Sequence, residues 1–256
     1  MAAEQDLMGV RVLVTGGTSG LGLAMVRALA GAGARVALTG RTAQGVGEAA
    51  SGIPGAAGFV ADVRDQASVV GAVDAVWDAF GGIDVLVNNA GLGMKTVNPD
   101  FMARPQGFWD VPVEGFRAVI ETNLTGYFLM AREITPRMLA AGHGRIVNIS
   151  MNHSTMNRKG FVPYGPSRAG AEALSRIMAA DLADTGIRVN MLLPGGATRT
   201  GMLPSGTELP ASLQLLDPEV MAVPVVWLAS KEAADVHDER IIATEFDAWR
   251  SQRLSA

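Results

Sequence analysis

The amino-acid sequence predicts a single α/β domain, 1–256, built on a doubly wound parallel sheet of about seven strands. A chain of 256 residues fits one larger domain. Short runs of valine, isoleucine and leucine alternate with longer segments of helical period. The 31 glycines have no three-residue period, so they indicate tight turns rather than a fibrous chain. Because such sheets bind ligands beyond the carboxyl ends of their strands, we expect functional residues to follow strands.

The expected strands are short apolar runs, which are typical of strands buried on both faces of a sheet. They are residues 10–14, 35–38, 58–60, 85–88, 145–149, 188–192 and 240–243. The expected helices carry an apolar stripe, as Val69, Val73 and Val76 do. They are residues 21–30, 66–80, 113–139 and 167–183. Two long irregular stretches, 92–112 and 195–218, are predicted to contact substrate, because long loops in compact domains usually serve binding.

The composition excludes several classes of function. A formal net charge of −4 leaves no basic field for a nucleic-acid backbone or an anionic membrane. The chain has no cysteine, and its three histidines lack a carboxylate at metal-binding spacing, so neither a disulfide nor a metal site is expected. The first ten residues are unlike a secretory signal, and no apolar stretch approaches the roughly 20 residues of a membrane span. A cytoplasmic protein with a small-molecule partner is expected.

A glycine-rich turn follows the first expected strand and leads into a helix. It reads Thr15-Gly16-Gly17-Thr18-Ser19-Gly20-Leu21-Gly22. Glycines permit a sharp turn and a close approach of the backbone, and the amides and dipole at a helix start attract negative charge. The turn therefore predicts a Rossmann-type cradle for a dinucleotide phosphate, with a purely structural tight turn as the alternative.

Three motifs together resemble the short-chain dehydrogenase/reductase family. They are TGGTSGLG at residues 15–22, Asn88-Asn89-Ala90-Gly91 after the fourth strand, and Tyr164 followed four residues later by a cation. The resemblance covers residues 10–202 and continues more loosely to residue 243. It implies that a nicotinamide dinucleotide is held by Gly16, Thr18, Ser19, Gly20, Leu21, Gly22, Asn89, Ala90 and Gly91.

The resemblance extends to the adenosine end of the cofactor. Asp62 and Val63 follow the third strand, where the family contacts the adenine. The second strand ends in Gly40 and Arg41. Glycine cannot accept a hydrogen bond from a ribose 2′-hydroxyl, whereas arginine can pair with a 2′-phosphate. NADP is therefore expected in preference to NAD.

The segment after the sixth strand resembles the family's nicotinamide-binding turn. Pro194 and Gly195 match its Pro-Gly step, and a threonine that bonds the nicotinamide carboxamide follows. Thr200 is the expected equivalent, and Thr198 is the alternative because the register is one residue off.

Tyr164 and Arg168 are the expected catalytic pair, and the resemblance gives both a contact with the cofactor. Hydride transfer to a carbonyl leaves an alkoxide that needs a proton, and Tyr164 is expected to donate it. A phenol ordinarily has a pKa near 10, and a cation on the same helix face lowers that pKa by stabilising the phenolate. The family has lysine in this place. Arg168 keeps the charge but not the compact ammonium that reaches the nicotinamide ribose.

A serine that the resemblance implies thirteen residues before the tyrosine is missing. Position 151 is methionine, whose thioether cannot donate a hydrogen bond to a substrate oxygen. Ser150 and Ser154 are the first candidates to replace it, Asn152 and Thr155 are the next, and a site without any replacement stays open. Asn123 matches the family's helix asparagine that holds a proton-relay water, with a buried packing role as the alternative.

These residues predict an NAD(P)(H)-dependent oxidoreductase that transfers hydride between the nicotinamide and a ketone, an aldehyde or a secondary alcohol. Halohydrin dehalogenases are one alternative, because they share the fold and Tyr-x-x-x-Arg, although they fill the glycine turn with an aromatic residue. A dinucleotide-binding protein without catalysis is the other, since the family's serine and lysine are both absent. The resemblance also implies a homodimer or homotetramer that pairs helices 113–139 and 167–183.

Overall fold

The strands form one parallel sheet whose order reverses beside the first strand. The computed structural model describes residues 6–204 and 213–254. Within these residues the sheet has seven strands in the order β3-β2-β1-β4-β5-β6-β7, which confirms the predicted fold class. The strands are β1 (Arg11–Val14), β2 (Arg35–Gly40), β3 (Ala56–Val60), β4 (Val85–Asn88), β5 (Gly144–Ile149), β6 (Ile187–Leu193) and β7 (Arg240–Ile242).

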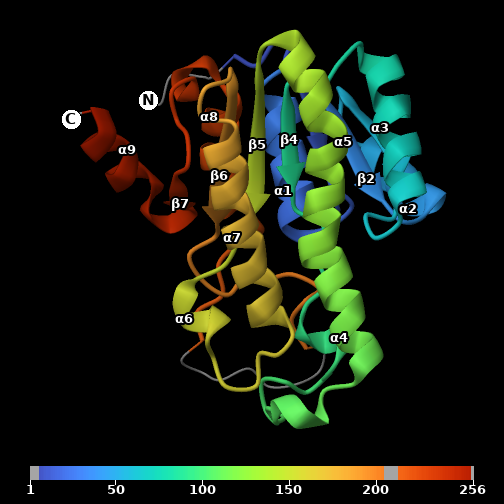
Figure 1. The fold of residues 1–256 in the computed structure, drawn as a ribbon, viewed down its shortest axis with the longest axis vertical. Helices are drawn as coiled ribbons and strands as arrows, with labels where there is room; N and C mark the ends of the chain where they lie inside the picture. Colours follow the sequence, from blue (N-terminus) through green and yellow to red (C-terminus); the bar gives the residue numbers. More distant parts are fainter. Residues whose placement is uncertain (1–5, 205–212, 255–256) are drawn as a thin grey trace.

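The helices cover both faces of the sheet (Figure 1). In the described ranges they are α1 (Gly20–Gly31), α2 (Ala43–Ser51), α3 (Gln66–Phe80), α4 (Val113–Ile120), α5 (Gly126–Ala141), α6 (His153–Met156), α7 (Tyr164–Asp181), α8 (Ala222–Ala229) and α9 (Phe246–Leu254). Val12 and Val14 of β1 pack on the face with α1 and α8, whereas Leu13 packs on the opposite face with α3 and α5. Successive side chains of a strand point to opposite faces, so apolar runs satisfy both layers.

One expected helix, 113–139, is interrupted in the structure. It divides into α4 and α5, which are joined by a π-helical turn at Glu121–Thr125. Hydrophobic periodicity could not distinguish this turn, because a π turn changes the hydrogen-bond spacing without changing the composition. Asn123 lies within it and is fully buried.

Helices α2 and α9 are among the elements that lie outside the expected helical ranges. Helix α2 buries a single residue, Val46, and contains two glycines, so it carries no apolar stripe. Thr42 starts it by accepting a hydrogen bond from the amide of Gly45 at 3.2 Å. Helix α9 is anchored through Phe246 and Trp249, whose rings lie 5.5 and 5.6 Å from the ring of Trp227. Both helices depend on tertiary contacts rather than on a local pattern.

A third apolar cluster lies beyond the carboxyl ends of the strands. In Figure 1 the strands run down the page, and α4 and α6 lie below their ends. The cluster is formed by Met94, Val97, Phe101, Met151, Met156 and Phe161. It belongs to neither face of the sheet, so it forms a separate wall at the end where ligands are expected. Among the described residues, no helix combines the length and the hydropathy of a membrane span.

Candidate active site

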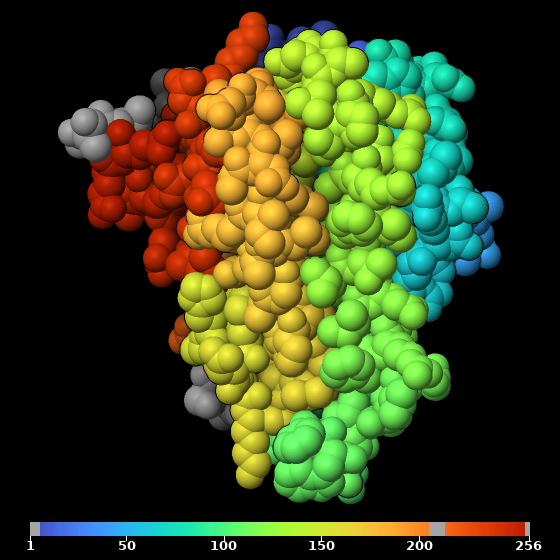
Figure 2. Space-filling model, viewed as in Figure 1, coloured from blue at the N-terminus to red at the C-terminus, as the bar shows by residue number. Residues whose placement is uncertain are grey.

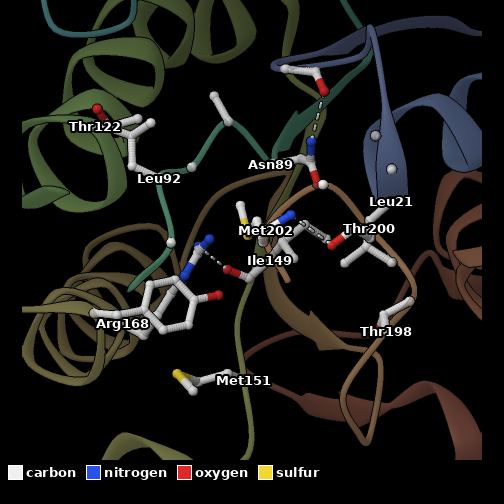
Figure 3. Close-up of a pocket in the computed structure, with 18 of the residues that line it drawn as sticks. Leu21, Asn89, Leu92, Thr122, Ile149, Met151, Arg168, Thr198, Thr200 and Met202 are labelled. Atoms are coloured by element: carbon white, nitrogen blue, oxygen red, sulfur yellow. Dashed lines mark hydrogen bonds between the residues drawn. The ribbon is translucent and has the colours of Figure 1, made fainter. Parts of the chain in front are cut away.

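A cavity of about 600 Å³ lies at the carboxyl ends of the strands, where the strand order reverses. The glycine turn, the ends of β2 and β3, the segment after β4 and the loops after β5 and β6 line it. Both long stretches reach it. The first does so through Met94 and Phe101, and the second through Thr200 and Met202 (Figure 3). Positions 205–212 of the second stretch lie outside the described residues. All the expected cofactor-binding residues line this cavity.

The glycine turn has the shape of a phosphate cradle. Gly16 adopts a φ of +63°, and a Cβ there would lie 2.8 Å from the Cα of Ala90. Ser19 precedes α1 without capping it by a side-chain hydrogen bond, and the first turn of α1 has no acidic residue. The first amides of α1 and the positive end of its dipole are therefore left for an anionic ligand. The residues present fit the pyrophosphate of a dinucleotide.

Asn89 fixes the turn against the end of β4. Its Nδ2 donates hydrogen bonds to the carbonyl oxygens of Thr15 at 2.9 Å and Gly16 at 3.1 Å. The hydroxyl of Thr15 accepts from the amides of Asn89 at 2.9 Å and Ala90 at 3.0 Å. These four hydrogen bonds hold two of the sequence motifs in one rigid unit before any ligand binds.

The adenosine end of the cavity carries more positive than negative charge. Arg64 donates to Asp62 from Nε at 2.9 Å and from Nη2 at 2.6 Å. These hydrogen bonds hold the pKa of Asp62 below its usual range, against partial burial, and the charge of Arg41 adds to the effect. Arg41 is exposed and lines the cavity. Asp62 therefore shares its carboxylate with a neighbouring cation, which the sequence did not indicate.

The cavity as a whole is cationic although the chain is not. Its described lining has four arginines and one aspartate, whereas the complete chain has a formal net charge of −4. A field of this sign inside a cleft attracts an anionic ligand. The charge distribution is thus complementary to a dinucleotide.

Tyr164 and Arg168 lie on one face of the first turns of α7. The guanidinium carbon of Arg168 is 5.4 Å from the centroid of the Tyr164 ring. Arg168 is only 2% exposed, and its Nη1 donates to the carbonyl oxygen of Ile149 at 2.8 Å (Figure 3). Pro166 lies in the first turn of α7, where its missing amide proton removes no helical hydrogen bond. The structure brings the expected pair together.

A second tyrosine, which the sequence analysis did not single out, contacts the same guanidinium. Tyr127 on α5 accepts a hydrogen bond from Nη1 of Arg168 at 2.6 Å and donates to the carbonyl oxygen of Ile149 at 3.1 Å. Burial raises the pKa of Tyr127, and Arg168 only partly opposes this effect. Tyr127 therefore remains a neutral donor. Its hydroxyl, the guanidinium and one backbone carbonyl form a closed triangle behind the cavity.

Asn123 joins three segments around the cavity without lining it. Its Oδ1 accepts from the amide of Leu92 at 2.8 Å, and its Nδ2 donates to the carbonyl oxygen of Leu92 at 2.9 Å and to Oγ of Ser167 at 3.0 Å. The side chain thereby connects the π turn with the segment after β4 and with α7. The role of Asn123 in holding a relay water remains a prediction.

The residues expected to replace the missing serine are placed unequally. The hydroxyl of Ser150 donates to Glu172 on α7. Ser154 is exposed and does not line the cavity. Ser150 lines the cavity, so Glu172 accepts its hydrogen bond at the edge of the site, whereas Ser154 on α6 lies outside the lining. A substrate-polarising role for either serine remains a prediction. Asn152 and Thr155 both line the cavity. The Nδ2 of Asn152 donates a hydrogen bond to the carbonyl oxygen of Gly195 at 2.8 Å.

Glu172 is the central residue of a polar cluster, which includes the hydroxyl of Ser150 as a hydrogen-bond donor. It also pairs with Nε of Arg240 at 2.9 Å and with Nε2 of His153 at 3.0 Å. Burial opposes its ionisation, but the hydrogen bonds from Ser150, His153 and Arg240 lower the pKa of Glu172 by more. The cluster holds the end of β5 against α7 and β7. It supports the cavity wall from behind.

The turn after β6 closes the cavity near the glycine turn. Pro194 and Gly195 line it, and Gly195 adopts a φ of +99°. A Cβ placed on Gly20 would lie 3.1 Å from Cγ2 of Thr200. Thr198 lines the cavity too (Figure 3). The proximity to the cradle favours Thr200 over Thr198.

Comparison with known proteins gives consistent results. A family model described as short chain dehydrogenase matches residues 10–208. The D-threitol dehydrogenase of Mycolicibacterium smegmatis is 34% identical over 255 residues, which cover 92% of each chain. The 3-oxoacyl-[acyl-carrier-protein] reductase of Vibrio cholerae is 31% identical and covers 92% of this chain and 96% of its own.

Solved structures agree with these matches. A structure from Sinorhizobium meliloti superposes with a TM-score of 0.80 at 31% identity and covers 95% of this chain and 98% of its own. Another, described as a short chain dehydrogenase/reductase family protein, has a TM-score of 0.77 at 35% identity and covers 93% and 96%. The similarity in both cases extends over more than nine-tenths of this chain.

Proposed function

This chain belongs to the short-chain dehydrogenase/reductase family and is a nicotinamide-dependent oxidoreductase, and we propose that it exchanges hydride between NADP(H) and an apolar carbonyl compound or the corresponding secondary alcohol. When bound, the nicotinamide supplies or accepts the hydride. The cradle from Gly16 to Gly22 and the Asn89–Gly91 segment hold the dinucleotide. One observation supports this proposal most strongly: the cradle, Tyr164 and Arg168 all line the same cationic cavity.

In this proposal Tyr164 is the acid and base of the reaction. Its hydroxyl donates a proton to the substrate oxygen in the reductive direction and accepts one in the oxidative direction. Arg168 supplies a fixed positive charge that stabilises the phenolate, and its burial excludes water that would screen this charge. Asn123 keeps the π turn and the start of α7 in register.

The proposal is tested by spectrophotometry with the purified protein. We expect a change in nicotinamide absorbance with NADPH and at least one apolar ketone or aldehyde, and the reverse change with NADP⁺ and the alcohol. If calorimetry detects binding of neither dinucleotide, the proposal fails. The halohydrin-dehalogenase alternative and the non-catalytic alternative find no support, since the glycine turn contains no aromatic residue and the named relatives are dehydrogenases and reductases.

We expect Arg41 to determine the preference for NADP. Replacing it with glutamine should weaken NADPH binding about 10-fold, because a charge-assisted hydrogen bond contributes about 1.5–3 kcal/mol, while NADH binding stays within about 2-fold. Titration of each dinucleotide measures this difference. Arg117→Gln is the control, since Arg117 is an exposed arginine paired with Glu114 away from the cavity. Equal losses for both dinucleotides would contradict the assignment.

The substrate side of the cavity indicates an apolar substrate. Phe101 and Phe161 pack edge to face with centroids 5.8 Å apart, and Met94 and Met151 continue this wall. Met151 is 8% exposed and lies where the family has a hydrogen-bond donor. The substrate oxygen in this proposal relies on Tyr164, and Thr155 is a second hydroxyl donor on the cavity lining. Apolar and aromatic carbonyl compounds suit such a surface better than polyols do.

A hydroxyl at position 151 should improve turnover. We expect Met151→Ser to raise kcat/KM about 10-fold for a small ketone, because a hydrogen bond to a developing charge contributes about 1.5–3 kcal/mol. Met151→Ala is the matched control for the lost volume, and both variants should lose about 2–3 kcal/mol of stability. Steady-state kinetics and thermal unfolding measure these effects. Equal kcat/KM values for the serine and alanine variants would contradict the expectation.

A homodimer or homotetramer is proposed on the face that α5 and α7 share (Figure 2). On it Phe128 and Ile177 are 44% and 58% exposed, and Ala173 and Ala180 are small and exposed. Apolar, small side chains of this kind allow helices of two copies to approach closely. Light scattering measures the state. The cytoplasmic location remains a prediction from the sequence.

A further inference from the structure

The chain contains two tyrosines, and both face the guanidinium of Arg168. The guanidinium carbon lies 5.4 Å from the ring centroid of Tyr164 and 5.5 Å from that of Tyr127. The two rings differ in position, because Tyr164 lines the cavity whereas Tyr127 is 1% exposed and lies behind it. Tyr164 can therefore contact a ligand in the cavity, whereas Tyr127 contacts the guanidinium from the buried side.

The hydroxyl oxygen of Tyr127 is one of few groups that accept a hydrogen bond from the buried guanidinium of Arg168. No carboxylate of the described residues pairs with this buried arginine. Its Nε is also buried, and no described residue accepts a hydrogen bond from it. Within the described parts of the chain, Nη1 donates hydrogen bonds to the hydroxyl of Tyr127 and the carbonyl oxygen of Ile149. Burial lowers the pKa of Arg168, but the facing phenols raise it by more, so that the guanidinium stays charged. The hydroxyl of Tyr127 is one of two acceptors that orient this charge.

The remaining edge of the guanidinium faces the cofactor motif. A Cβ placed on Gly91 would lie 2.5 Å from Nη2 of Arg168 and 3.2 Å from Oδ1 of Asn123. The triangle of Tyr127, Ile149 and Nη1 therefore fixes the rotation of a planar group whose other edge abuts the Asn-Asn-Ala-Gly segment. Arginine is larger and more directional than lysine, so its use here requires a defined orientation.

We propose that Tyr127 is a positioning residue that orients the Arg168 guanidinium toward Tyr164 and thereby makes arginine serviceable in place of lysine. This proposal rests on the proposed function, in which Tyr164 is the proton donor. Tyr127 does not touch the substrate cavity and acts only through Arg168. Loss of its hydroxyl removes one of the two hydrogen bonds that orient Nη1. The guanidinium then spends less time facing Tyr164, and its electrostatic stabilisation of the Tyr164 phenolate becomes weaker.

The first test compares Tyr127→Phe with a matched control. We expect Tyr127→Phe to lower kcat about 10-fold with a smaller change in KM, as a lost hydrogen bond to a charged group implies. Ser175→Ala is the control, because Ser175 is also buried, accepts from an amide nitrogen at 2.8 Å and donates to a backbone carbonyl at 2.7 Å, but lies away from the guanidinium. Unchanged kcat in Tyr127→Phe, or an equal loss in Ser175→Ala, overturns the proposal.

The second test reads the phenol directly and needs no turnover. With two tyrosines in the chain, Tyr127→Phe leaves Tyr164 as the sole source of the tyrosinate absorbance, and Tyr164→Phe assigns the signal of Tyr127. We expect the titration midpoint of Tyr164, measured with NADP⁺ bound, to lie about one pH unit higher in Tyr127→Phe than in the unmodified protein, consistent with a weakened interaction of about 1.4 kcal/mol. The other ionisable groups on the described lining are Arg41, Asp62, Arg64 and Arg158, and all are unchanged by the substitution. An unchanged or lower midpoint overturns the proposal.

The third test is a double-mutant cycle with Arg168→Lys. If Tyr127 acts through the guanidinium, Tyr127→Phe should lower kcat by less than about 2-fold in the lysine background, against about 10-fold in the arginine background. Equal effects in both backgrounds would show that Tyr127 serves packing alone. A protein with the shifted midpoint but no turnover would retain the positioning role and reject the proposed function, so the two failures are distinguishable.

Discussion

Replacing Tyr164 by phenylalanine is expected to lower kcat by about 10²- to 10⁴-fold, the range that general acid catalysis contributes. Phenylalanine keeps the ring that packs against the apolar wall and the ring face that Arg168 contacts at 5.4 Å. It removes only the hydroxyl that exchanges the proton with the substrate oxygen. The remaining rate comes from cofactor positioning. Single-turnover kinetics at saturating NADPH measure the chemical step without product release.

Two properties of this variant should stay unchanged. The affinity for NADPH should remain within about 3-fold and the stability within about 1 kcal/mol, since the hydroxyl contributes to neither the cradle nor the core. A variant that keeps more than a tenth of the rate would remove Tyr164 from the proton transfer. In that case another hydroxyl on the lining, such as that of Thr155, would have to supply the proton.

The sheet and the cofactor cradle were predictable because their signals are local. Each central strand is buried on both faces, so its run of valines and leucines is continuous and unambiguous. The glycine turn is likewise determined by neighbours in the chain, since Gly16 and Gly20 adopt positive φ angles that other residues rarely adopt. Helix α2 escaped prediction for the opposite reason, because it buries one side chain only.

The rest of the site depends on pairs that are distant in sequence. Tyr127 and Arg168 are 41 residues apart, and a tyrosine in an apolar helix gives no sign of the charge it contacts. Ser150 was one candidate for contact with the substrate, and its hydrogen bond to Glu172, 22 residues later in the sequence, could not be read from local pattern. Asn123 could be identified as a buried polar residue, whereas the π turn around it could not. Sequence reasoning thus recovered the motifs but not the contacts that orient them.

Adding one methyl group at Gly22 is expected to lower dinucleotide affinity at least about 100-fold, because the turn must open to accommodate it. A Cβ there would collide with the carbonyl oxygen of Gly16 and would lie 2.5 Å from Nδ2 of Asn89. These two atoms form the hydrogen bond that holds the cradle against β4, at 3.1 Å. Overpacking at such a place costs about 1–3 kcal/mol of stability, and a displaced amide no longer donates to a phosphate.

Gly71→Ala is the matched control for this substitution and should have the opposite sign. Gly71 lies within α3, is exposed, and has no atom within 4 Å of the position of a Cβ. Alanine there should raise the stability by about 0.5–1 kcal/mol, since glycine weakens a helix interior, and should leave dinucleotide affinity unchanged. Isothermal titration and thermal unfolding of both variants separate the two effects. Normal affinity in folded Gly22→Ala would mean that phosphate binding does not require the tight approach of Gly16 and Asn89.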